Sequence, residues 1–234
     1  MGTDSQQAKL YVILGSHACR TGMLMLEHKG IPYRSVTIPT GTQRLMPLFR
    51  FPHGTVPALV VDGRRVQKNR AIARSLDELQ PEPPLFPHDE PLRAKVEEAE
   101  HWGDEVFQMA ARRITLAAAL HGPETLIDRG DRGRLGPLLW HHARTRLIGA
   151  RAVGRMVFNV NPRTENELLA TLPALLDRID ACIEDGVLNG ERLYAADYMI
   201  APSVALLMYR RDLRQEIERR PAAALADRIL PEPS

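Results

Sequence analysis

The chain has 234 residues, 44% of them hydrophobic and 26% charged, with a formal net charge of +2 at pH 7. This length and composition suit one large or two modest globular domains with a sizeable core. The charge is too evenly balanced for the basic stripe of a nucleic-acid-binding protein, and no apolar run approaches membrane-spanning length. We therefore expect neither nucleic acid nor a membrane as a partner.

Cysteine usage and the first residues predict a reducing, cytoplasmic environment. Cys19 and Cys182 are the only cysteines and lie too far apart in the sequence to suggest a disulfide framework. Residues 1–9 are polar where a signal peptide would need an apolar stretch.

The chain begins with a predicted strand and helix. Residues 9–14, which are apolar after Lys9, indicate a buried strand, and Gly15 then turns the chain into a helix over 17–29. A second strand is predicted over 33–38, and 40–51 is at best a broken helix because it contains glycine and proline.

A hairpin and a second helix follow. The β-branched run 58–61, an Asp62-Gly63 turn and residues 65–67 predict the hairpin, and Asn69 is the expected N-cap of a helix that ends at Leu79. Pro57 cannot donate to a strand ladder, so we expect it to open the third strand with a cis Val56-Pro57 bond. That geometry would turn the Val56 backbone outward, where it could pair with an extended peptide ligand.

Five prolines within residues 81–91 predict a linker, after which the pattern changes to helices only. Apolar residues at steps of three or four predict a long helix over 92–118, with Trp102 in the core. Further helices are expected over 135–160, 168–183 and 195–209, with a connecting loop over 130–136. The expected fold class is an α/β region followed by an all-α region.

Three patches of the sequence are distinctive. They run from Ser16 through Cys19 to the helix end before Tyr33, from Pro52 through Val56-Pro57 to Leu59, and over Arg70 to Ala73. A softer fourth patch spans Ala196 to Pro202, where Asp197 is the one remaining residue of a capping box. Together these patches resemble glutathione S-transferases. The resemblance covers nearly the whole chain. It implies a thioredoxin-like domain over residues 1–82, an all-helical substrate-binding domain over 89–234, and a homodimer.

Ser16 is the residue to which the resemblance assigns catalysis. It aligns with the serine that opens this helix in the serine-type classes and hydrogen-bonds the glutathione thiolate. Taken alone, a serine before a helix is more often a plain N-cap. Cys19 lies in the same turn, where a helix N-terminus could acidify its thiol as in glutaredoxin-like or omega-type members. Those members place the cysteine where Ser16 stands, so a buried, inert thiol is the favoured interpretation of Cys19.

Lys68 and Asn69 stand where many family members carry Glu or Gln followed by Ser to hold the γ-glutamyl group. Asn69 could still donate to the carboxylate. Lys68 would set an ammonium against the ammonium of the ligand, unless it points into solvent as most lysines do.

The resemblance implies an enzyme that adds an activated thiolate, with glutathione as co-substrate, to a small electrophile. The site residues would be Ser16, Val56, Lys68 and Asn69. No metal is expected, since the histidines lack metal-ligand spacing. The alternatives are a thiol-dependent isomerase or disulfide reductase on the same fold, and a non-catalytic binding module in which Lys68 marks a decayed site.

Overall fold

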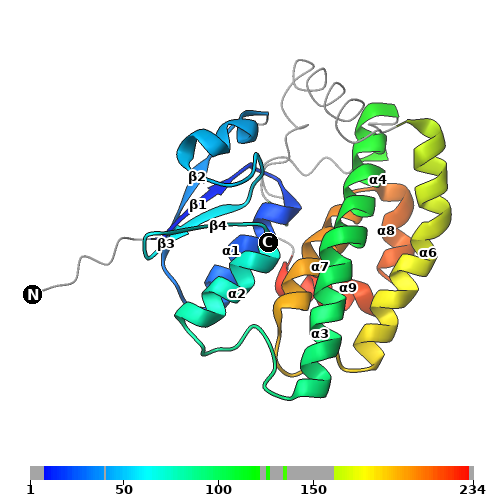
Figure 1. Cartoon of the computed structure of the whole chain (residues 1–234). Helices are drawn as coiled ribbons and strands as arrows, with labels where there is room; N and C mark the ends of the chain where they lie inside the picture. The colour runs from blue at the N-terminus through cyan, green and yellow to red at the C-terminus, as the bar shows by residue number, and fades with distance from the viewer. Residues whose placement is uncertain (1–7, 40, 122–124, 127–133, 136–160, 232–234) are drawn as a thin grey trace, which may run out of the picture.

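The amino-terminal part of the protein contains a four-stranded mixed sheet (Figure 1). The structure, a computed structural model, describes residues 8–39, 41–121, 125–126, 134–135 and 161–231. The strands are β1 (Ala8–Val12), β2 (Tyr33–Thr37), β3 (Ala58–Val61) and β4 (Arg64–Gln67), in the order β2-β1-β3-β4. β1 pairs parallel with β2 and antiparallel with β3. The hairpin prediction is confirmed. Asp62 and Gly63 both have positive φ, 47° and 74°, as a tight two-residue turn requires.

Two helices, α1 (His17–His28) and α2 (Asn69–Leu79), lie between the sheet and the helical region (Figure 1). The extent of α1 agrees with the prediction, and a 3-10 helix, η1 (Thr42–Phe49), replaces the expected broken helix. The Val56-Pro57 bond is cis, as predicted, and β3 begins one residue after Pro57. The helix α2 ends at Leu79 as predicted, but it begins one residue earlier than predicted, at Asn69, because its cap is Lys68.

The second half of the described chain is helical. It comprises α3 (Glu90–Trp102), a π-helical segment η2 (Gly103–Phe107), α4 (Gln108–His121), α6 (Pro162–Glu184), α7 (Ala195–Leu207), α8 (Arg211–Ile217) and α9 (Pro221–Ile229). The long helix predicted over 92–118 is therefore continuous but contains the π-helical segment, and Trp102 is buried as predicted. The predicted helix over 135–160 and loop over 130–136 lie outside the described residues, apart from positions 134 and 135.

Every residue of α7 is buried, as expected for a helix that is apolar on all sides. It contacts α1 of the sheet region and α3, α4 and α9 of the helical region, so it is the centre of the core. At Gly103 an added Cβ would lie 3.0 Å from a side-chain carbon of Ile200. Glycine therefore allows η2 to approach α7 closely.

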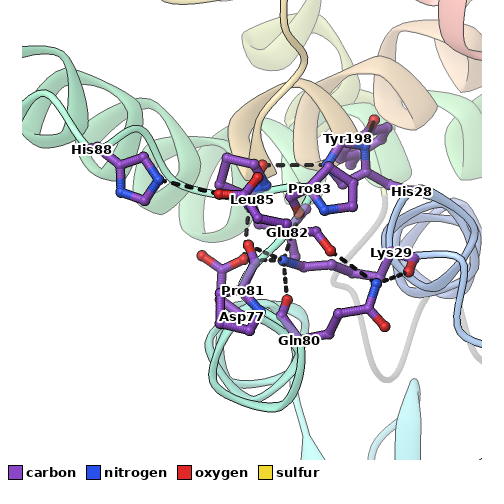
Figure 2. Close-up of polar contacts among 11 residues, drawn as sticks. His28, Lys29, Asp77, Gln80, Pro81, Glu82, Pro83, Leu85, His88 and Tyr198 are labelled. Carbon is purple, nitrogen blue, oxygen red and sulfur yellow. Dashed lines mark hydrogen bonds and ion pairs between the residues drawn. The ribbon is translucent and has the colours of Figure 1, made fainter.

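The proline-rich linker is held by a buried lysine (Figure 2). Lys29, at the end of α1, has a fully buried side chain whose Nζ forms an ion pair with Asp77 of α2. The same Nζ donates to the backbone carbonyls of Gln80, Pro81 and Pro83, at 2.7, 3.1 and 2.6 Å. A buried charge is tolerated only when it is paired and hydrogen-bonded, and here the linker carbonyls supply most of the partners. We call Lys29 with these four partners the linker clamp.

Candidate functional site

Ser16 is the N-cap of α1. Its backbone is extended (φ −80°, ψ 114°), and its Oγ accepts a hydrogen bond from the Cys19 backbone N–H at 3.3 Å. A helix N-terminus presents unpaired N–H groups and the positive end of the helix dipole, and a serine hydroxyl that accepts one bond still has its own hydrogen to donate. The partly exposed Ser16 is therefore placed to stabilise an anion such as a thiolate.

Cys19 faces the interior. It is buried, and its Sγ accepts a 3.5 Å hydrogen bond from the Ile13 N–H. Burial raises the pKa of the Cys19 thiol. Hydrogen bonds with Ser16 and with the Ile13 backbone lower this pKa, but by less than burial raises it. Since the thiolate is the reactive form, this environment keeps the thiol protonated. The predicted burial is confirmed.

Three segments meet at Gly22, near the middle of α1. An added Cβ there would lie 3.4 Å from Pro57 Cβ and 3.5 Å from Asn69 Oδ1. The loop that contains Val56 and the start of α2 thus pack against the helix that Ser16 opens. The structure therefore brings together the segments that carry Ser16, Val56, Lys68 and Asn69, the four residues that the sequence analysis singled out.

Lys68 and Asn69 differ sharply in environment. Lys68 is exposed and has φ 70°, ψ 137°, a sparsely populated conformation for a non-glycine residue that often accompanies a functional site. Asn69 is only 3% exposed, and its Nδ2 donates to the Ala18 carbonyl at 2.9 Å, while its Oδ1 has no hydrogen-bond partner among the described residues. Because the Asn69 side chain is directed toward α1, the outward-facing donors at this point are the backbone N–H groups of the first turn of α2.

Acidic residues of the helical region face this end of α2. Glu100 of α3 is fully buried and pairs with Arg70 at 3.3 Å and with Arg74 through two hydrogen bonds of 2.8 and 2.9 Å. Burial raises the pKa of Asp104 in η2, with Glu105 and Glu100 adding to the shift and the positive charges of Arg70 and Lys68 opposing it. The Lys68 ammonium therefore has a carboxylate within electrostatic range.

Sequence patterns did not single out Asp104, Glu100 or Arg112. Arg112 of α4 lies close to the first turn of α1, where its charge acts on both Cys19 and His17. Charged residues on a helix are ordinarily solvent-exposed, so only the packing of α3, η2 and α4 against α1 and α2 reveals these three. Among the described residues, no three His, Cys, Asp or Glu side chains are grouped closely enough to hold a metal ion.

Comparisons with known proteins agree on the fold. Residues 10–84 match the family model of the glutathione S-transferase N-terminal domain. No curated protein matches the chain in sequence. The chain is similar in structure to β-etherase LigF from Sphingobium sp. strain SYK-6, with 20% identity, a TM-score of 0.70 and coverage of 97% of this chain and 96% of that one.

Two further solved structures resemble it over almost the whole length. One is a glutathione S-transferase from Rhodospirillum rubrum F11, with 23% identity, a TM-score of 0.58 and coverage of 97% and 93%. The other is a glutathione transferase from Pseudomonas putida solved with glutathione disulfide bound, with 15% identity, a TM-score of 0.59 and coverage of 98% and 87%. The chain has the glutathione transferase fold, a thioredoxin-like domain with a mixed four-stranded sheet followed by a helical region. In the part of the chain that the structure describes, no helix has the length and apolar character needed to cross a membrane.

Proposed function

We propose that this chain is a member of the glutathione transferase family that activates a thiol, glutathione itself, for attack on a small electrophile. The observation that carries the proposal is the position of Ser16, whose hydroxyl caps α1 at the edge of a thioredoxin-like domain. A hydrogen bond to a charged partner contributes about 1.5 to 3 kcal/mol, enough to favour the thiolate over the thiol by roughly ten- to a hundredfold. Structural relatives that are glutathione transferases support the choice of thiol.

In this proposal each segment has a role. Ser16 stabilises the thiolate, the Val56 backbone pairs with the backbone of the tripeptide, and the start of α2 at Asn69 receives a carboxylate of the ligand through its backbone N–H groups. The two domains would span residues 1–82 and 89–234, and the protein would act as a cytoplasmic homodimer in the detoxification of electrophiles.

One observation separates the proposal from a disulfide reductase or isomerase that uses its own cysteine. Cys19 is 1% exposed and its thiol pKa is raised, so it is a poor nucleophile. A non-catalytic binding module is the second candidate, favoured by the exposed ammonium of Lys68 at the position expected to meet the ligand's own ammonium.

Titration of glutathione by calorimetry into the wild type and Lys68→Glu tests the proposal. The glutamate would add a partner for the ligand's ammonium, so we expect binding to tighten a few-fold, since an exposed charge contact contributes about 0.2 to 1 kcal/mol. Lys9→Glu is the matched control, because Lys9 is exposed near the beginning of β1, at the far end of that strand from Ser16. It should leave the affinity unchanged.

Three outcomes are distinguishable. Tighter binding by Lys68→Glu alone supports the glutathione site. Equal effects of both substitutions would assign the gain to overall charge instead. Absence of binding by folded wild type and folded Lys68→Glu would rule glutathione out as the thiol.

A further inference from the structure

The side chain of Gln67, the last residue of β4, is buried and reaches the loop that precedes β3. Its Oε1 accepts a hydrogen bond from the His53 N–H at 2.7 Å. Its Nε2 donates to the carbonyls of His53 and Thr55, at 2.7 and 2.9 Å. Two carbonyls face the nitrogen and an N–H faces the oxygen, so both ends of the carboxamide have complementary partners. Gln67 is only 5% exposed, which leaves water little access to these bonds.

The backbone of this loop depends on Gln67 for its hydrogen bonds. Gln67 pairs with Ala58 where the ladder between β3 and β4 ends. Within the described part of the chain, residues 53–56 make no backbone–backbone hydrogen bond. The carboxamide offers the same N–H and C=O groups as a peptide bond, so it extends the ladder to a stretch that has no ladder bonds of its own. One side chain therefore holds the backbone that leads into Val56.

Core packing anchors the loop at its two ends but not in its middle. Phe51 is buried and packs edge-on against a ring of β1, with ring centroids 5.6 Å apart. The cis Pro57 is buried and packs against α1. Between these anchors, positions 53 and 55 are exposed. Hydrogen bonds, rather than apolar burial, must therefore define the conformation of the middle of the loop.

The backbone of Val56 is left open to a ligand by this arrangement. Among the described residues, neither its N–H nor its carbonyl has a hydrogen-bond partner. A free N–H and a free carbonyl at the edge of a sheet allow an extended peptide to pair as an added strand. We propose that Gln67 is a positioning residue that holds the loop over 53–55 so that Val56 pairs with the backbone of a peptide ligand. The inference rests on the proposed function for that ligand, glutathione.

Loss of the three bonds to Gln67 weakens binding because fewer molecules have the loop in its binding conformation. The apparent dissociation constant is the intrinsic one divided by the fraction that is competent to bind. A competent fraction of about one tenth therefore weakens binding about tenfold. The fold as a whole is held elsewhere, so this loss of affinity is separable from a loss of stability.

Calorimetric titration of S-methylglutathione tests the inference, because this ligand keeps the peptide backbone of glutathione but has no thiol to ionise. We expect Gln67→Met to bind it about tenfold more weakly than the wild type. Gln80→Met is the matched control. The Nε2 of Gln80 also donates to two backbone carbonyls, those of Lys29 and Glu82, but at the opposite end of α2. This control should lower stability and keep the affinity of the wild type.

Gln67→Glu adds a pH dependence that lost packing alone would not produce. The ionised carboxylate can accept from the His53 N–H, but it sets an oxygen against the carbonyls of His53 and Thr55. Once protonated, the introduced group can donate to one of these carbonyls. We expect its affinity to be about tenfold below that of the wild type at pH 7.5 and to recover at pH 5.5, since burial favours the protonated form. Gln67→Met, which adds no charge, should be equally impaired at both pH values.

Hydrogen exchange of the His53 amide, followed by NMR, tests the loop without a ligand. We expect this amide to exchange about tenfold faster in Gln67→Met than in the wild type, because its acceptor is gone. The rate should be unchanged in Gln80→Met. The amides of β3 should keep their protection in both variants, which would show that the opening is confined to the loop.

An affinity that is unchanged in Gln67→Met, or reduced equally in Gln80→Met, would overturn the inference. A deficit of Gln67→Glu that is the same at both pH values would overturn it too, because the lost donors would then not matter. A wild type that binds S-methylglutathione without ionising the thiol of glutathione would reject the proposed thiol activation, while the Gln67-dependent affinity would uphold the inference. If the folded wild type binds neither ligand, the proposed function fails and the His53 exchange decides. Faster exchange in Gln67→Met alone would uphold the hold on the loop, and unchanged exchange would overturn it.

Discussion

The Nδ1 atom of His28 lies 2.9 Å from the hydroxyl of Tyr198, although 170 positions separate the two residues in sequence. The other ring nitrogen, Nε2, lies 3.3 Å from the carbonyl of Pro84. Burial lowers the pKa of His28, so the ring is neutral, with Nε2–H donating to Pro84 and Nδ1 accepting from Tyr198. One imidazole therefore joins α1, the linker and α7 beside the linker clamp (Figure 2).

Tyr198→Phe should destabilise the protein by about 1 to 2 kcal/mol, because the substitution removes a hydrogen bond and leaves His28 Nδ1 without a partner in a half-buried site. Urea unfolding followed by circular dichroism would measure this. Tyr33→Phe is the control, since the Tyr33 hydroxyl bonds the exposed Glu27 at 3.0 Å and should change stability by less than about 0.5 kcal/mol. Equal losses in the two variants would show that the His28 contact contributes nothing beyond a surface hydrogen bond.

Lys29→Met should cost more, about 3 kcal/mol or above, because it leaves the Asp77 carboxylate and three linker carbonyls without their shared donor. The linker should also become accessible to proteases, and limited proteolysis would detect cleavage near residues 80–84. Lys9→Met, which removes an exposed ammonium, is the control and should unfold like the wild type. A Lys29→Met protein that is as stable and as resistant as the wild type would contradict the clamp.

The sequence predicted elements whose signals are local. Ser16, the Asp62-Gly63 turn and the β-branched run 58–61 each act through neighbours a few residues away, and the structure has the corresponding helix start, turn and strand. The same reasoning put the cap of α2 at Asn69, because asparagine is a favoured cap residue. In the fold the Asn69 side chain instead contributes to packing against α1, through its bond to Ala18.

Features that depend on distant segments could not be predicted from local pattern. Lys29 follows a helix and precedes a glycine, which suggests an exposed end, and only the return of the linker over it explains its burial. Arg112 and Asp104 carry no local signal for a site, since their importance comes from the approach of α4 and η2 to α1 and α2. Ser16 was predictable as a cap because that role involves only its neighbours in sequence. Its proposed role toward a thiol involves a bound ligand, which a local pattern does not describe.

Ser16→Ala should lower the rate of thiol transfer by about ten- to a hundredfold, because the hydroxyl stabilises an anion that forms only after the thiol ionises. It should also lower the free energy of unfolding by about 1 kcal/mol through loss of the cap. Spectroscopic titration of the bound thiol would show its pKa raised, which cap loss alone would not cause. The comparison is Cys19→Ser, which should spare activity because the thiol is buried and protonated. A Cys19→Ser protein without activity beside an active Ser16→Ala protein would favour the redox alternative.

Asp197 makes stability depend on pH in an unusual direction. Its buried carboxylate accepts hydrogen bonds from the backbone N–H groups of Asn189, at 2.6 Å, and Tyr194, at 2.8 Å. Burial nevertheless dominates and raises the pKa of Asp197 from 3.8 to about 6. Between these two values the folded state binds more protons than the unfolded state. The contribution of Asp197 to stability is therefore fully present below pH 3.8 and is lost as the pH rises through 6.

We expect the stability difference between the wild type and Asp197→Asn to be greater at pH 4.5 than at pH 7.5, by roughly 2 kcal/mol, because one pKa unit corresponds to about 1.4 kcal/mol. The comparison with the variant removes the contribution of His17 and His28, which is common to both proteins. The pKa values of these two histidines are lowered in the folded state, so they destabilise the protein as the pH falls, opposite to Asp197. Urea unfolding at both pH values would measure the four free energies. Asp89→Asn is the comparison, because Asp89 caps α3 in an exposed position through the Leu92 N–H at 3.0 Å. A difference for Asp197→Asn that is the same at both pH values, or larger at pH 7.5, would mean that the carboxylate is ionised in the folded protein throughout this range and that its hydrogen bonds outweigh its burial.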